Sequence, residues 1–198
     1  MLSLFYERTN DYFTMDMYQA KDRLALIYRT QNWNYYQSFG MSANIPFSIG
    51  GWLSSQMNAT VVNDRNRCDN FWDIPFDRKK WACMLGMQNH FSVGSTLGFD
   101  LDAMYRSSMI SGISDTRPVF TVNVGAQWNF LKDKASLSLN CSDQFDTMRM
   151  KVRNRHAGQY VDLNMGQYSR TVSVKFVYRF GGSISKEKKE VDASRFGR

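Results

Sequence analysis

The stretch that decides the fold of this chain is Arg170-Thr-Val-Ser-Val-Lys-Phe-Val-Tyr-Arg-Phe180. Every second residue is apolar: Val172, Val174, Phe176, Tyr178 and Phe180. The residues between them are mostly polar: Thr171, Ser173, Lys175, Val177 and Arg179. Because an extended chain directs successive side chains to opposite faces, this pattern predicts a strand with one apolar face. Its length of about ten residues suits a tilted strand that crosses a bilayer. By itself, the stretch also fits an amphipathic strand of a soluble sandwich.

The rest of the chain repeats the alternation. The segments that show it are 1–7, 33–47, 52–62, 81–93, 97–106, 120–130 and 137–142. Asn89 is an exception, a polar residue in the apolar series of its segment. Together with the last strand, these segments predict eight antiparallel strands.

The connections alternate in length. Short turns are expected at Ser48–Gly51, Gly94-Ser95 and Leu131–Lys134, and long polar loops at 8–32, 63–79, 107–118 and 143–167. Within the first loop, Leu24–Tyr28 could form a short strand extension. Turns on one side and loops on the other are typical of outer-membrane barrels, whereas sandwiches lack this regularity. The predicted fold class is therefore all-β, an antiparallel transmembrane β-barrel.

Composition agrees with this prediction. The 198 residues contain 14 Phe, 10 Tyr and 5 Trp, which suit aromatic girdles at the membrane interfaces. The mean hydropathy is −0.46, and no run of about 18 apolar residues occurs, so a transmembrane helix is excluded. Met1-Leu-Ser-Leu-Phe-Tyr6 lacks the features of a secretory signal and is expected to begin within a strand.

The chemical motifs favour no enzyme and no cofactor. The net charge is +7, but the basic residues are scattered through loops and polar strand faces, so nucleic acid is not an expected partner. The 3 cysteines and 2 histidines lack metal-ligand spacing. The pairs Asp100/Asp102 and Asp143/Asp146 could do acid–base work. Hydration, or pairing of the first two with Arg106, Lys175 or Arg179, is the simpler interpretation, and His90 is expected to be merely hydrogen-bonded.

Two groups of residues are predicted to carry function. The polar series would line an aqueous lumen, where substitutions tune selectivity. Its candidate members are Gln56, Asn58, Gln88, Asp100, Asp102, Asn123, Gln127, Lys175 and Arg179. The second group is Phe176, Tyr178 and Phe180, which could equally form a lipid-facing girdle.

The end of the chain resembles the C-terminus of Bacteroidetes outer-membrane β-barrel proteins related to TonB-dependent receptors. The resemblance rests on Thr171–Phe180, with the Gly-Gly and lysine-rich tail that follow, and on Ala135–Arg149 with its Asp143-Gln-Phe145 segment. Leu2–Arg8 and Tyr36–Met41 contain similar phrases. The resemblance implies a barrel of about 22 strands, preceded by a plug domain. It also implies that the terminal aromatics are the signal read by the barrel-assembly machinery.

On this resemblance, 1–182 would be the C-terminal part of a larger barrel. The charged composition of 183–198 predicts a disordered tail, which is periplasmic because eight strands leave both ends on the side of the short turns. The barrel would contact outer-membrane lipid, bind a nutrient of unknown identity, and reach TonB or a surface lipoprotein through upstream domains. Two alternatives stay open. One is a self-contained eight-stranded barrel with a structural or adhesive role. The other is a soluble lipid-binding barrel, which would need apolar residues inside.

Overall fold

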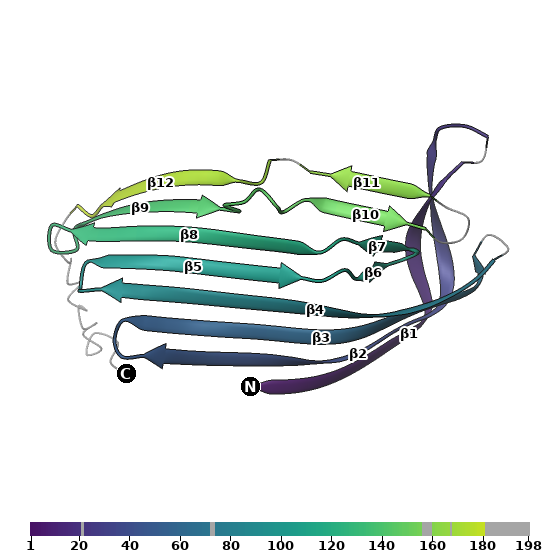
Figure 1. The fold of residues 1–198 in the computed structure, drawn as a ribbon, viewed down its shortest axis with the longest axis horizontal. Coiled ribbons are helices and arrows are strands. Elements are labelled where there is room, and N and C mark those ends of the chain that lie inside the picture. The colour runs from purple at the N-terminus through teal and green to yellow at the C-terminus, as the bar shows by residue number, and fades with distance from the viewer. Residues whose placement is uncertain (21, 72–73, 156–159, 167, 181–198) are drawn as a thin grey trace, which may run out of the picture.

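The computed structural model describes residues 1–20, 22–71, 74–155, 160–166 and 168–180. Figure 1 shows a long, curved, antiparallel sheet with a smaller sheet at one end. The main sheet has 8 strands in the order β1-β2-β3-β4-β5-β8-β9-β12. Their bounds are β1 Leu2–Gln19, β2 Leu26–Ile49, β3 Leu53–Phe71, β4 Ile74–Val93, β5 Leu97–Arg106, β8 Val119–Phe130, β9 Ala135–Ser142 and β12 Thr171–Tyr178. The eight predicted strands and their antiparallel order are confirmed.

The two ends of the main sheet differ. The turn end carries the tight connections β2–β3, β4–β5 and β8–β9. Gly50 and Gly94 adopt positive φ there, as do Leu131, Lys132 and Asp133. The opposite end, which we call the hairpin end, carries the long connections. The smaller sheet lies toward this end, with the order β11-β10-β7-β6. Its strands are β6 Ile110–Ser111, β7 Ser114–Thr116, β10 Met150–Asn154 and β11 Val161–Met165.

The long polar segments are not the loops that the sequence predicts. β1 and β2 stay paired from Leu2↔Ala43 to Gln19↔Leu26, and β3 and β4 stay paired up to Phe71↔Ile74. The segments 107–118 and 143–167 contain β6, β7, β10 and β11. Alternation is weak in these hairpins, where buried positions also carry polar residues such as Asn63, Asp64 and Asn66. The hairpins therefore form by pairing of their backbones without an amphipathic signal.

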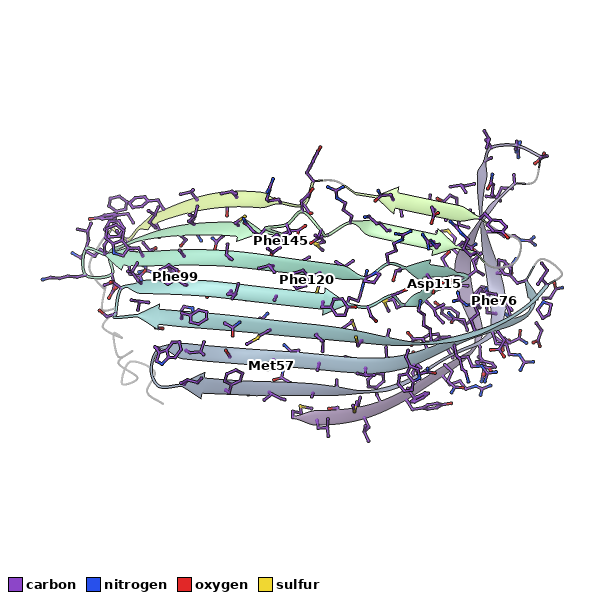
Figure 2. The ribbon with its side chains drawn as sticks, in the orientation of Figure 1. Met57, Phe76, Phe99, Asp115, Phe120 and Phe145 are labelled. Atoms are coloured by element: carbon purple, nitrogen blue, oxygen red, sulfur yellow. The ribbon has the colours of Figure 1, made fainter. Side chains whose placement is uncertain are left out.

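The strand register aligns the apolar series into rows that run across the sheet. Met57 lies opposite Met87, which lies opposite Ala103, which lies opposite Val122. Most large apolar side chains of these rows are exposed, including Met57, Phe99 and Phe120, which are labelled in Figure 2. A continuous exposed apolar face of this extent is incompatible with water and marks a membrane or partner surface.

The polar exception Asn89 is explained by its neighbours. Ser55 Oγ donates to Asn89 Oδ1 over 2.6 Å, and Asn89 Nδ2 donates to the Leu101 carbonyl over 3.0 Å. Both side chains are buried. Because each polar group finds a partner, the pair is tolerated within the apolar series.

The buried aromatic core lies outside the apolar rows, at the hairpin end. Trp33, Phe71 and Phe76 pack with Cys68, and Ile113 from the β6–β7 turn joins them. The rings of Trp33 and Phe76 meet edge to face, with centroids 5.1 Å apart. This cluster joins the β1–β2 and β3–β4 hairpins to β6–β7, so the hairpin end has a core of its own (Figure 2).

Candidate functional site: the polar face and the hairpin end

The predicted lumen residues lie on one face of the main sheet, opposite the apolar rows. Gln56, Gln88, Asp102 and Asn123 are direct neighbours across β3, β4, β5 and β8. The adjacent row contains Ser54, His90, Asp100, Gly125 and Asn140. Strand register therefore gathers residues that are far apart in sequence into a patch rich in amides and carboxylates.

This patch lines a hollow of about 670 Å³, which we call the central hollow. Five predicted residues border it: Gln56, Gln88, Asp100, Asp102 and Asn123. Asn58 lies in a second hollow of about 490 Å³, which adjoins the first at Gln88, Asp102 and Asn123. The structure thus brings six of the predicted residues into two adjoining hollows.

The other three predicted residues lie toward the turn end. Gln127 Nε2 donates to Asn129 Oδ1 over 3.0 Å, and Lys175 lies opposite Ser138. Arg179 Nη1 donates to the Asp133 carbonyl over 2.8 Å, which ties the end of the last strand to the β8–β9 turn. These residues share the polar face but do not border the central hollow.

Asp100 has a partner that differs from those expected. Its Oδ1 lies 2.7 Å from His90 Nδ1, and both side chains are about half exposed, at 50% and 52%. His90 is thus hydrogen-bonded, as predicted. Arg106, Lys175 and Arg179 are not the partners of Asp100, because the register places His90 directly opposite it on β4.

The Asp143/Asp146 pair noted in the sequence holds the segment that follows β9, through partners that the sequence did not indicate. Thr147 N–H and Met148 N–H donate to Asp143 over 3.0 and 2.8 Å, and Ser169 Oγ also donates to this carboxylate. Burial works against the charged form of Asp143, but these hydrogen bonds outweigh it and lower its pKa to about 2. Ser169 N–H donates to Asp146 over 3.0 Å, and Arg149 pairs with the same carboxylate.

The role of this pair of aspartates is structural. They connect the chain just after β9 to the residues just before β12, with their own φ angles at 45° and 53°. Asp tolerates this left-handed conformation better than most residues. Their spacing of three residues was visible in the sequence, but their common partner Ser169 was not.

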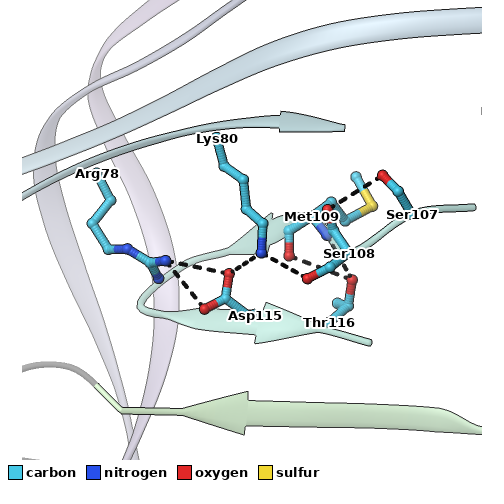
Figure 3. Close-up of polar contacts among 7 residues, drawn as sticks. All are labelled: Arg78, Lys80, Ser107, Ser108, Met109, Asp115 and Thr116. Carbon is cyan, nitrogen blue, oxygen red and sulfur yellow. Dashed lines mark hydrogen bonds and ion pairs between the residues drawn. The ribbon is translucent and has the colours of Figure 1, made fainter. Parts of the chain in front are cut away.

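An unpredicted cluster holds the β6–β7 hairpin against β4 (Figure 3). Asp115 on β7 accepts from Lys80 Nζ over 2.7 Å and from Arg78 Nη2 over 3.1 Å. Lys80 also donates to Ser108 Oγ over 2.7 Å. Burial disfavours the charge on Asp115, but the two cations more than compensate and lower its pKa. The cluster therefore fixes the position of the β6–β7 hairpin beside β4.

The terminal aromatics are exposed on the apolar series. Phe176 and Tyr178 belong to β12, whereas Phe180 lies two residues beyond its end. The rings of Tyr178 and Phe180 meet edge to face at 4.5 Å, and Phe176 lies 6.3 Å from Phe130. Their position fits a girdle at the turn end. A role as an assembly signal remains a prediction.

Comparison with known families bears on this architecture. The model of the outer membrane protein beta-barrel family matches residues 1–178. The chain belongs to this family. Its location is accordingly the bacterial outer membrane, and its fold is an outer-membrane β-barrel. No curated protein and no solved structure matches the chain.

Membership of the outer membrane protein beta-barrel family explains the two faces of the sheet. Barrel strands alternate lipid-facing apolar residues with polar ones, and the exposed apolar rows fit this pattern. No helix among the described residues is long and apolar enough to cross a membrane.

Proposed function

We propose that this chain contributes pore wall and extracellular loops to a TonB-dependent-receptor-like barrel that binds and takes up a nutrient. The observation that carries the proposal is the chain of adjoining hollows on the polar face. Gln88, Asp102 and Asn123 border both the central hollow and its neighbour. Such a path of amides and carboxylates can exchange hydrogen bonds with a hydrated solute in successive positions.

The edges of the sheet support a barrel wider than eight strands. Among the described residues, β1 pairs only with β2, and β12 pairs only with β9. An open edge has no place in the bilayer, because unpaired backbone groups there cost several kcal/mol each. The edges must therefore meet each other or further strands. An eight-stranded barrel has its interior filled by side chains. The small residues Gly86, Gly98 and Gly125 on the polar face suit a wider lumen better.

The remaining partners follow from this proposal. Outer-membrane lipid covers the apolar rows, and the barrel-assembly machinery reads Phe176, Tyr178 and Phe180. Upstream domains would provide contact with TonB or a surface lipoprotein. No catalytic role is proposed, since proteins of this architecture typically act as pores, receptors or adhesins.

The size of the native polypeptide tests the proposal. An antibody raised against 183–198, a tail outside the described residues, would be used on outer-membrane fractions. A band several times heavier than 23.0 kDa is expected for a receptor-sized barrel. A band near 23 kDa that shifts on boiling contradicts it and supports the alternative, a self-contained eight-stranded barrel with a structural or adhesive role.

A further inference from the structure

A third hollow on the polar face differs in chemistry from the central hollow. It has a volume of about 430 Å³ and lies between the hairpin-end portions of β5 and β8 and residues 148–149, 165–166 and 168–169. We call it the mouth hollow. Met104, Met148 and Ser169 border both it and the second hollow, so the three hollows form one track along the sheet.

The walls of the mouth hollow are apolar and adaptable. Met104, Met148, Met165 and Tyr168 line it, and all four side chains are exposed. Met84 lies directly opposite Arg106 on β4 and is exposed as well. Apolar groups are unexpected on a face otherwise composed of amides, hydroxyls and carboxylates. Flexible thioether side chains fit ligands of irregular shape, which makes methionine frequent at adaptable binding surfaces.

For one cation in this hollow, the described residues provide no counterion. Arg106 is half-buried, its Nε is buried without a hydrogen-bond partner, and no carboxylate of the described residues forms an ion pair with it. Leaving a buried donor of a charged group unsatisfied is costly, and an anion that reaches it recovers that cost. The planar guanidinium also matches a carboxylate with two parallel hydrogen bonds.

Two other polar residues of the hollow, Arg149 and Ser169, are already engaged. Arg149 pairs with Asp146, and its aliphatic stem lies over Gly166, where an added Cβ would be 3.2 Å from Arg149 Cγ. Ser169 donates to Asp143 and Asp146. Arg106 is therefore the cation of the hollow that no carboxylate of the described residues engages.

We infer that the mouth hollow binds an amphipathic organic anion, with its carboxylate on Arg106 and its apolar body among Met104, Met148 and Met165. This inference rests on the proposed uptake function and adds a substrate class to it. Asp102 and Asp143 border the next hollow along the track. Their negative charges oppose movement of an anion from the mouth hollow into that next hollow. The mouth hollow is therefore the first binding site for the anion at the hairpin end.

Methionine methyl NMR of the native barrel in lipid nanodiscs tests the inference. The protein would carry ¹³C-methyl methionine, with resonances assigned by single Met→Leu substitutions. The probe is 3-phenylpropanoate, a water-soluble aromatic carboxylate. We expect saturable shifts at Met104, Met148 and Met165, and none at Met57 and Met87 on the apolar face. Arg106→Gln should weaken binding by about ten- to a hundredfold, as expected for loss of a charged hydrogen-bond donor.

Three controls separate the parts of the inference. Arg23→Gln removes the same charge from the exposed β1–β2 connection and should leave binding unchanged. Arg106→Lys retains charge without the planar fork and should give an intermediate loss. Unchanged resonances of Met57 and Met87 show that each variant is folded.

Several results would overturn the inference. They are an absence of shifts, binding that survives Arg106→Gln, equal binding of the neutral 3-phenylpropan-1-ol, or equal binding of acetate. The neutral alcohol would indicate an apolar hollow alone, and acetate a simple anion site. None of these results changes the size of the native polypeptide. The proposed uptake function and the inferred anion site can therefore be disproved independently of each other.

Discussion

At the scale of single residues, Asp143 determines how the chain returns from β9 to β12. Its carboxylate accepts hydrogen bonds from Thr147, Met148 and Ser169, and its side chain is buried. Its own N–H donates to Asn123 Oδ1 over 2.9 Å, so the same residue is attached to the polar row of β8. One carboxylate thus orients the segment that forms the wall of the mouth hollow.

Asp143→Asn should loosen this segment. The amide keeps the shape of the side chain but replaces one accepting oxygen with a donor, which faces groups that also donate. We expect a loss of about 1–3 kcal/mol of local stability. Hydrogen exchange of peptides covering 143–149 and 168–171 measures it. Asp133→Asn, at the exposed β8–β9 turn, is the matched control and should leave that exchange unchanged.

The lowered pKa of Asp143 also predicts a dependence of stability on pH. The folded value is about 2, below the value of about 4 expected for an unfolded chain. The stabilisation is therefore complete above about pH 4 and is lost as the pH falls from 4 to 2. Urea unfolding of wild type and Asp143→Asn across this range measures the difference between them. A constant difference would contradict the assignment.

At the scale of elements, the β6–β7 hairpin is held by two different attachments. Ile113 enters the aromatic core of the hairpin end, and Asp115 binds Arg78 and Lys80 on β4. The apolar contact contributes burial, whereas the ion pairs set the position of the hairpin. Because these charged side chains are mostly shielded from solvent, their pairing is worth more than that of exposed ions.

Asp115→Asn should release the hairpin from β4. Removing the charge leaves two cations with one neutral acceptor, at an expected cost of about 1.5–3 kcal/mol. Limited proteolysis of outer-membrane fractions, with cleavage sites mapped by mass spectrometry, should show new cuts within 107–117. Asp162→Asn disturbs the pairing with Arg153 and Arg155 on β10–β11 and serves as control. Equal cleavage in both variants would argue against this anchor.

The last strand gives a prediction about assembly. If Phe176 and Phe180 are read by the barrel-assembly machinery, replacing both with Ala should lower the amount of assembled barrel several-fold. Refolding into detergent in vitro should be affected far less. The measurement is the fraction of heat-modifiable protein in outer membranes. Phe99→Ala, at an exposed aromatic of the inner strand β5, is the control. Equal assembly defects would indicate a girdle role only.

At the scale of the whole molecule, neighbouring residues of one strand lie on opposite faces of the sheet. Met87 belongs to the apolar rows, and Gln88 borders the central hollow. Met87→Arg should destabilise the barrel by about 2–4 kcal/mol, as arginine does near the midplane of a bilayer. Gln88→Arg should cost much less, because its side chain reaches water. Urea unfolding in liposomes measures both, and equal costs would contradict the orientation of the sheet.

The spanning strands and their two faces were predictable from sequence. Lipid on one face and water on the other impose a period of two, which 97–106 and 120–130 show clearly. The turns at Gly50 and Gly94 followed from local backbone chemistry. Six predicted polar residues also share two adjoining hollows, because a common face and consecutive antiparallel pairing bring them together.

The contacts at the hairpin end were decided by tertiary structure alone. Residues 8–19 and 63–71 form strands without a clear apolar series, and buried positions of the second segment carry polar side chains such as Asp64 and Asn66. Asp115 meets Lys80 from 35 residues away, and Ser169 meets Asp143 from 26. The mouth hollow joins Arg106 to methionines from two other segments. Such contacts depend on register, twist and the paths of the hairpins, which no local pattern of residues encodes.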